Sequence, residues 1–112
     1  MNQHHYLDAI FNPKSIAVIG AREKPNTAGS IVFKNLLECG YLGKVYPVNP
    51  KHALIFNQKS YKSIGEIEEK IDLAIILTPA IVVEEVLIQC AKKNIKIAII
   101  IILVVFYKLR KL

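Results

Sequence analysis

Ser15-Ile-Ala-Val-Ile-Gly20 is a short apolar run that ends in glycine, which is the pattern of a strand buried on both faces of a parallel sheet. Residues 28–39 come next, with Val32, Leu36 and Cys39 at positions i, i+4 and i+7 and a glycine directly after them. This spacing predicts a helix with one apolar stripe and a glycine stop. A buried strand followed by an amphipathic helix is the repeating unit of α/β folds.

The rest of the sequence continues this alternation. Four further strands are expected, at residues 44–48, 59–63, 72–77 and 96–102. Ser63 and Glu66 match a capping box and predict a short helix through residue 70. Thr78 is expected to cap a longer helix in which Pro79 is the first residue. These elements predict an α/β domain with a doubly wound parallel sheet of strand order 3-2-1-4-5, in which the short strand at 59–63 is third.

Length and composition narrow the class of protein. A chain of 112 residues is enough for one domain, and 53% hydrophobic residues exclude global disorder. The formal net charge of +6 favours anionic partners, but the basic residues are scattered and match no nucleic-acid-binding module. Two cysteines are too few for a disulfide scaffold and suit a reducing cytoplasm.

The loop after the first strand is the first candidate site. Ligands of doubly wound sheets bind beyond the carboxyl ends of the strands, at the switch point beside strand one. Gly20 permits a tight exit from the strand, and Gly29 permits a close approach to the first turn of the helix. The helix N-terminus together with Arg22 and Lys24 suits a phosphate. The alternative is an ordinary connection with solvated basic residues.

Missing motifs restrict the type of nucleotide. The loop matches neither the G-x-G-x-x-G pattern of dinucleotide sites nor the P-loop pattern. The end of the second strand carries Asn49-Pro50-Lys51 where a classical NAD site has an acidic residue. A lysine there suits a phosphorylated ribose, which both NADP and coenzyme A (CoA) contain. Thr78-Pro79-Ala80 presents another helix N-terminus at the same edge.

Four segments together resemble one protein family: residues 7–21, Lys24-Pro25, residues 43–51 and residues 72–80. Phe-x-Pro-x-Ser, Val-Ile-Gly-Ala, Pro-Val-Asn-Pro and Thr-Pro-Ala occur in the order of the N-terminal CoA-binding domain of NDP-forming acyl-CoA synthetases. That domain also occurs in succinyl-CoA synthetase alpha subunits. The resemblance implies a Rossmann-like fold that binds CoA or acyl-CoA.

The resemblance also assigns roles to single residues. The residues that would line CoA near the first strand are Gly20, Ala21, Arg22 and Lys24. Asn49 and Lys51 would meet the adenosine phosphate end, and Thr78 and Pro79 would flank the pantetheine arm. Arg22 stands where the family usually has serine.

The end of the sequence departs from the family. The family continues into a phosphohistidine domain and a nucleotide-grasp domain, whereas this sequence continues into an apolar and basic tail. We therefore expect a CoA-binding domain at residues 1–102, truncated after strand five, and a divergent tail at 103–112. The 11-residue apolar run Ile97–Tyr107 is too short for a membrane-spanning helix, which needs about 20 residues, so membrane attachment is disfavoured.

The expected function is a CoA-binding module of the acid–CoA ligase (NDP-forming) family that does not catalyse ligation alone. Its expected partners are separate synthetase subunits, or further copies that associate through exposed apolar surface. Two alternatives stay open: an NADP-binding oxidoreductase domain, and a gene remnant that keeps only the fold. His4, His5 and His52 have no metal-site or catalytic spacing, and Cys39 and Cys90 are expected in the core, so neither a catalytic nor a metal site is expected.

Overall fold

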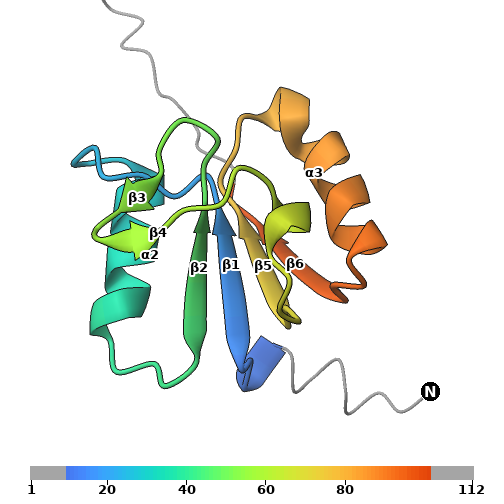
Figure 1. Cartoon of the computed structure of the whole chain (residues 1–112), viewed down its shortest axis with the longest axis horizontal. Coiled ribbons are helices and arrows are strands. Elements are labelled where there is room, and N and C mark those ends of the chain that lie inside the picture. Colours follow the sequence, from blue (N-terminus) through green and yellow to red (C-terminus); the bar gives the residue numbers. More distant parts are fainter. Residues whose placement is uncertain (1–9, 102–112) are drawn as a thin grey trace, which may run out of the picture.

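A parallel sheet of four strands forms the centre of the structure, a computed structural model that describes residues 10–101 (Figure 1). Its strands are β1 (Ser15–Ile19), β2 (Lys44–Val48), β5 (Leu73–Ile76) and β6 (Ile97–Ile100). They lie in the order β2-β1-β5-β6, and every neighbouring pair is parallel. The predicted α/β class and doubly wound arrangement are confirmed.

The side chains of β1 alternate between the two faces of the sheet, and the core therefore has two layers. Ile16 and Val18 pack on the sheet face that α2 (Ala28–Glu38) covers. Phe33 of this helix is fully buried in the same layer of the core. Ala17 and Ile19 point to the opposite face, which the residues of α3 (Ala80–Lys92) cover. Both faces of the sheet are thus covered at its central strands, which explains why β1 and β5 are continuous apolar runs.

The strand register brings the carboxyl ends together. Ile19 of β1 lies between Val48 of β2 and Ile76 of β5, and Ile76 in turn pairs with Ile100 of β6. All four strands therefore end at the same edge of the sheet, and the loops that follow β1, β2 and β5 emerge side by side there (Figure 1). This edge is where a doubly wound fold places its ligand.

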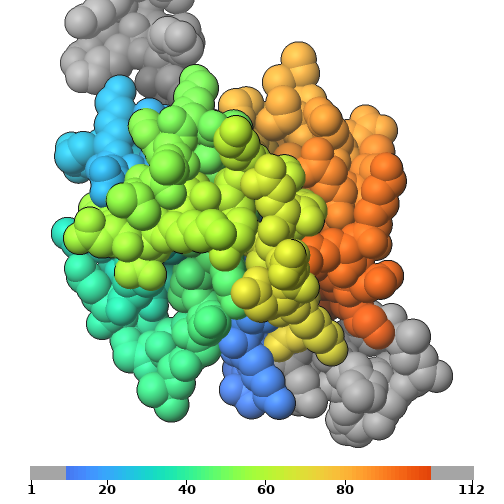
Figure 2. Space-filling model, viewed as in Figure 1, coloured from blue at the N-terminus to red at the C-terminus, as the bar shows by residue number. Residues whose placement is uncertain are grey.

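The segment between β2 and β5 differs from the prediction. The strand expected at 59–63 is reduced to one parallel bridge between Tyr61 and Val48, which lies beside β2 as the order 3-2-1-4-5 requires. Sequence analysis missed a hairpin of β3 (Leu54–Ile55) and β4 (Gln58–Lys59). Its turn residues Phe56 and Asn57 have φ values of 47° and 62°, which non-glycine residues rarely adopt. Figure 2 shows this segment lying across one side of the molecule, over the sheet.

The prediction of a short helix through residue 70 is wrong. Only η1 (Ile64–Glu66), a single 3-10 turn, forms there, and the Ser63 side chain makes no cap hydrogen bond. The Glu66 carboxylate instead accepts a 3.2 Å hydrogen bond from the backbone N–H of Lys62. Ile67 then adopts extended backbone, and it is buried in the core together with Ile64. Core burial along an extended chain has overridden the local capping signal.

The two cysteines lie in different surroundings. Cys90 on α3 is buried, as predicted. Cys39 is exposed, which corrects the expectation of a core position. It follows the last residue of α2, and its thiol turns back to the carbonyl of Leu36 at 3.7 Å instead of reaching the sheet.

Apolar side chains remain exposed beside the last strand. Ile99 and Ile100 of β6 are 42% and 41% exposed, and Ile81 of α3 is 91% exposed. This agrees with the expected exposure of apolar surface, while self-association through it stays a prediction. His4, His5 and the predicted tail at 103–112 lie outside the described residues.

Candidate functional site

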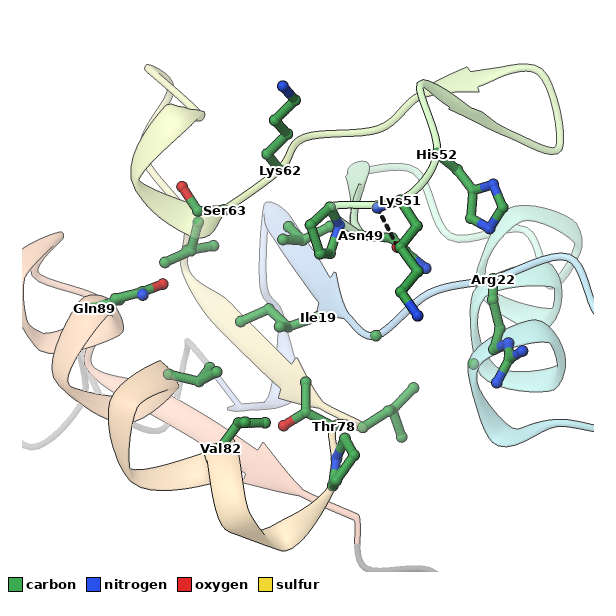
Figure 3. A pocket seen from close by; sticks show the side chains of 18 of the residues that line it. Ile19, Arg22, Asn49, Lys51, His52, Lys62, Ser63, Thr78, Val82 and Gln89 are labelled. Carbon is green, nitrogen blue, oxygen red and sulfur yellow. Dashed lines mark hydrogen bonds between the residues drawn. The ribbon is translucent and has the colours of Figure 1, made fainter.

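A cavity of about 440 Å³ lies at the carboxyl edge of the sheet (Figure 3). Its wall is formed by the loops that follow β1, β2 and β5, by the first turn of α2, by η1 and by one side of α3. Seven of the nine predicted site residues line it: Gly20, Arg22, Gly29, Asn49, Lys51, Thr78 and Pro79. The topology therefore gathers residues that are up to 59 positions apart in sequence, from Gly20 to Pro79.

The other two predicted site residues do not line this cavity. Ala21 is fully buried beneath it, and its carbonyl accepts a hydrogen bond from Asn49. Lys24 is exposed, and its carbonyl accepts a 2.7 Å hydrogen bond from the hydroxyl of Thr27. Both residues shape the loop that leads into α2.

Two glycines let β1 and α2 approach each other closely. Gly20 has a φ of +100°, and a Cβ there would also lie 3.1 Å from the backbone of Leu77. A Cβ on Gly29 would clash with the carbonyl oxygen of Gly20 and lie 2.8 Å from Cγ of Arg22. The close approach that Gly29 permits is therefore to the protein's own backbone, which brings the first turn of α2 up to the cavity.

The first turn of α2 carries the potential anion site. Thr27 is the N-cap, and its Oγ1 accepts a 3.2 Å hydrogen bond from the N–H of Ser30. Helix geometry leaves the N–H groups of Ala28 and Gly29 without intrahelical partners, and both residues line the cavity. The positive end of the helix dipole adds to their attraction for a phosphate.

Asn49 holds two loops together. Its side-chain N–H donates to the carbonyl of Ala21 at 2.9 Å, and its Oδ1 accepts from the backbone N–H of Lys51 at 2.8 Å. The amide is therefore used within the protein, and it positions the Lys51 side chain, which points into the cavity between Ile19 and Arg22 (Figure 3). Lys51 and Arg22 place two positive charges at this end of the cavity.

Sequence reasoning missed several lining residues. His52 follows Lys51 and lines the same cavity, although it has no metal-site or catalytic spacing in the sequence. Lys62, Ser63 and Gln89 also line it, because the segment after β4 and one side of α3 fold over the carboxyl edge. No local pattern indicates that contact, since it depends on tertiary packing.

Thr78 follows β5, which lies on the other side of β1 from β2 and the Lys51 loop, and it does not cap α3 as expected. Pro79 is the N-cap residue, and the helix begins at Ala80 without a side-chain cap hydrogen bond. The Oγ1 atom of Thr78 is buried and has no hydrogen-bond partner in the described part of the chain. A buried hydroxyl without a partner costs about 1–3 kcal/mol, so a ligand that accepts its hydrogen bond would remove that cost.

Other kinds of site find no support within residues 10–101. No group of three or more potential metal ligands occurs there. No helix in that range is both long enough and apolar enough to cross a membrane.

The fold is that of a Rossmann-like α/β domain, with a cavity at the carboxyl edge of its sheet. A family model for CoA binding domains matches residues 14–105, which is most of the chain. The chain therefore belongs to the CoA-binding domain family, and the resemblance found in the sequence is confirmed.

Relatives within this family include large and small proteins. The alpha subunit of ADP-forming acetate–CoA ligase I from Pyrococcus furiosus is 48% identical over 95 residues, which cover 81% of this chain and 21% of that subunit. The dinucleotide-forming acetyl-coenzyme A synthetase 1 of Ca. Korarchaeum cryptofilum, solved with phosphate and ADP, superposes with a TM-score of 0.83 at 37% identity, over 88% of this chain and 21% of that one. This chain thus spans about a fifth of these relatives.

A hypothetical protein from Pyrococcus horikoshii is closer in size. It is 34% identical, with a TM-score of 0.73, and the match covers 88% of this chain and 68% of that one. The same domain therefore occurs in a much shorter chain.

Proposed function

We propose that this chain binds CoA or acyl-CoA in the cavity at the carboxyl edge of the sheet. The observation that carries the proposal is the convergence of the α2 N-terminus with the side chains of Arg22 and Lys51 around one cavity. Membership of the CoA-binding domain family selects CoA among the ligands that such a site could hold.

The arrangement of charges orients the ligand. Lys51, at the β2 end, would pair with the ribose phosphate of the adenosine moiety. The N–H groups of Ala28 and Gly29, together with Arg22, would bind the pyrophosphate beside β1. The pantetheine arm would then pass Thr78 and Pro79 at the end of β5. Gly20, Asn49 and Ala21 act by shaping this path.

We further propose that the chain contributes binding rather than the complete ligation reaction. The relatives include an acetate–CoA ligase alpha subunit that is about five times as long as the matched region. The cavity lining includes Ser63, His52 and Glu85, but among the described residues no hydrogen bond joins two of these side chains as a nucleophile–base pair would require. Separate synthetase subunits would supply the catalytic groups. The two free cysteines fit a cytoplasmic location.

Calorimetry and thermal melting of the full chain test the proposal. CoA should raise Tm by roughly 10 °C when its concentration is 100 times Kd, because a ligand that binds only the folded state then adds about 2.7 kcal/mol. Lys51→Glu should weaken the binding of CoA more than the binding of dephospho-CoA. The matched control is Lys44→Glu, which makes the same charge change at the opposite end of β2 and should leave both affinities unchanged.

The NADP alternative rests on the same lysine, which suits either phosphorylated ribose. NADP is therefore the competing ligand in this experiment. A Tm shift with NADP and none with CoA would replace the proposal by that alternative. A cooperative melt that responds to neither ligand would favour a chain that keeps only the fold.

A further inference from the structure

A second cavity, of about 520 Å³, continues the first along the carboxyl edge of the sheet. Four residues line both cavities: Arg22, Leu77, Thr78 and Pro79. The remaining lining of the second cavity comes from the start of α3 and the end of β6, through Ala80, Val83, Ile100 and Ile101. The two cavities therefore form one path that crosses the end of β5. We name the part beside β6 the β6 groove.

The chemistry of the wall changes along this path. The β2 end carries the Lys51 cation and the imidazole ring of His52, and the centre carries Arg22 and the α2 N-terminus. Beyond Thr78, the β6 groove is lined by aliphatic side chains and by Pro79. A matching ligand has an anionic end, a polar middle and an apolar end.

We infer that the β6 groove binds the acyl group of an acyl-CoA thioester, so that the domain prefers acyl-CoA with an aliphatic chain over free CoA. This inference rests on the proposed function. When the nucleotide lies at the ends of β2 and β1, the pantetheine arm passes Thr78, and its sulfur reaches the shared wall of the two cavities. An acyl chain attached to that sulfur continues in the direction of β6.

Thr78 supports this path by an independent observation. Its buried hydroxyl is without a partner among the described residues and stands at the junction of the two cavities. Figure 3 shows the hydroxyl pointing toward Val82, which also lines the first cavity. Because the oxygen atom itself is buried, the side chain must rotate before a carbonyl oxygen of the pantetheine arm can accept its hydrogen bond. The apolar groove begins directly beyond that point.

Two neighbouring isoleucines allow a matched test. Ile100 pairs with Ile76 and lines the β6 groove, whereas Ile99 pairs with Ile75, whose side chain belongs to the core layer on the other face of the sheet. Their exposed fractions are nearly equal, at 41% and 42%. Ile100→Asn and Ile99→Asn therefore make the same neutral change in the same strand, but only the first alters the groove.

The experiment measures Kd by calorimetry for CoA and for acetyl-, butyryl- and hexanoyl-CoA with the full chain. Each methylene buried in the groove should lower Kd by about two- to fourfold. Ile100→Asn should remove most of this dependence on chain length without changing Kd for CoA. Ile99→Asn should retain it. Urea denaturation of both variants confirms that they are folded.

Three results would overturn the inference. If CoA binds and the thioesters bind with the same Kd, the acyl assignment fails while the proposed function stands. If both isoleucine variants reduce the dependence of Kd on acyl-chain length equally, the β6 groove is not the site of the acyl chain. If neither CoA nor any thioester binds, the proposed function fails and the inference fails with it.

Discussion

The side-chain amide of Asn49 donates a 2.9 Å hydrogen bond to the backbone carbonyl of Ala21, and it thereby joins the loop after β2 to the loop after β1. Its oxygen accepts a second hydrogen bond, from the N–H of Lys51. One side chain therefore fixes two of the loops that form the cavity. Asn49 is a positioning residue, and its own polar atoms are occupied.

Replacing Asn49 tests this role. Asn49→Ala should lower the free energy of unfolding by about 1–3 kcal/mol, because the carbonyl of Ala21 loses its partner in a half-buried position. The urea midpoint measures the change. Asn35→Ala, at an exposed position on α2, is the control and should be neutral or slightly stabilising. Equal midpoints for the two variants would show that the amide does not hold the loops.

Gly29→Ala should destabilise the fold by about 1–3 kcal/mol. The added methyl group would collide with the backbone of Gly20, so either β1 or the first turn of α2 must move. Gly65→Ala is the control, because the nearest atom to its Cβ would be Ser63 Oγ at 3.9 Å. Chemical denaturation of both variants measures the difference, and a loss confined to Gly65→Ala would contradict the packing described here.

Thr78→Val and Thr27→Val make the same chemical change with opposite expected results. Thr78→Val should keep or raise the stability of the unliganded chain, by up to about 1 kcal/mol, because it removes a buried hydroxyl that has no described partner. Thr27→Val should lower it by about 1 kcal/mol, because it removes the N-cap of α2. Tm values measure both. A large loss for Thr78→Val would mean that its hydroxyl is already bonded within the protein.

Stability should decline at alkaline pH. Burial raises the pKa of the Cys90 thiol above its ordinary value of 9.0. Burial, and secondly the charge of Asp72, raises the pKa of Tyr41 above 10.0. The folded chain thus holds protons that the unfolded chain releases. Their contribution to the free energy of unfolding is fully present below pH 9 and is lost as pH rises through the folded pKa values.

Urea midpoints between pH 8 and pH 11 measure this decline. Cys90→Ala removes one of the groups and should make the decline shallower in the lower part of that range, even though the smaller side chain lowers stability at every pH. A midpoint for the original chain that does not change up to pH 11 would contradict the prediction.

Local patterns sufficed for the elements that span the sheet. The apolar run ending at Gly20, the stripe of α2 and the Thr-Pro-Ala segment before α3 each carry their information within a few neighbouring residues. Together with the apolar runs at 44–48, 72–77 and 96–102, they placed the four strands of the sheet and its two helices, and they located the carboxyl edge where the cavity lies. Seven of the nine expected site residues meet there because parallel strands end at one edge.

The features that were missed depend on distant contacts. The turn at Phe56 and Asn57 is stabilised by Glu23, whose carboxylate accepts a 2.5 Å hydrogen bond from the Phe56 N–H, across 33 residues of sequence. The capping box at Ser63 failed because burial of Ile67 favoured an extended chain. In both places a tertiary contact outweighed the local preference.

The exposure of Cys39 makes the unaltered sequence convenient for spectroscopy. Its thiol lies at the C-terminal end of α2, and the 11 residues of that helix span about 16 Å. The cavity lies at the N-terminal end of the same helix, while the other cysteine, Cys90, is buried. A maleimide dye added near neutral pH would therefore label one site, and it would report on the ligand cavity from a distance without obstructing it.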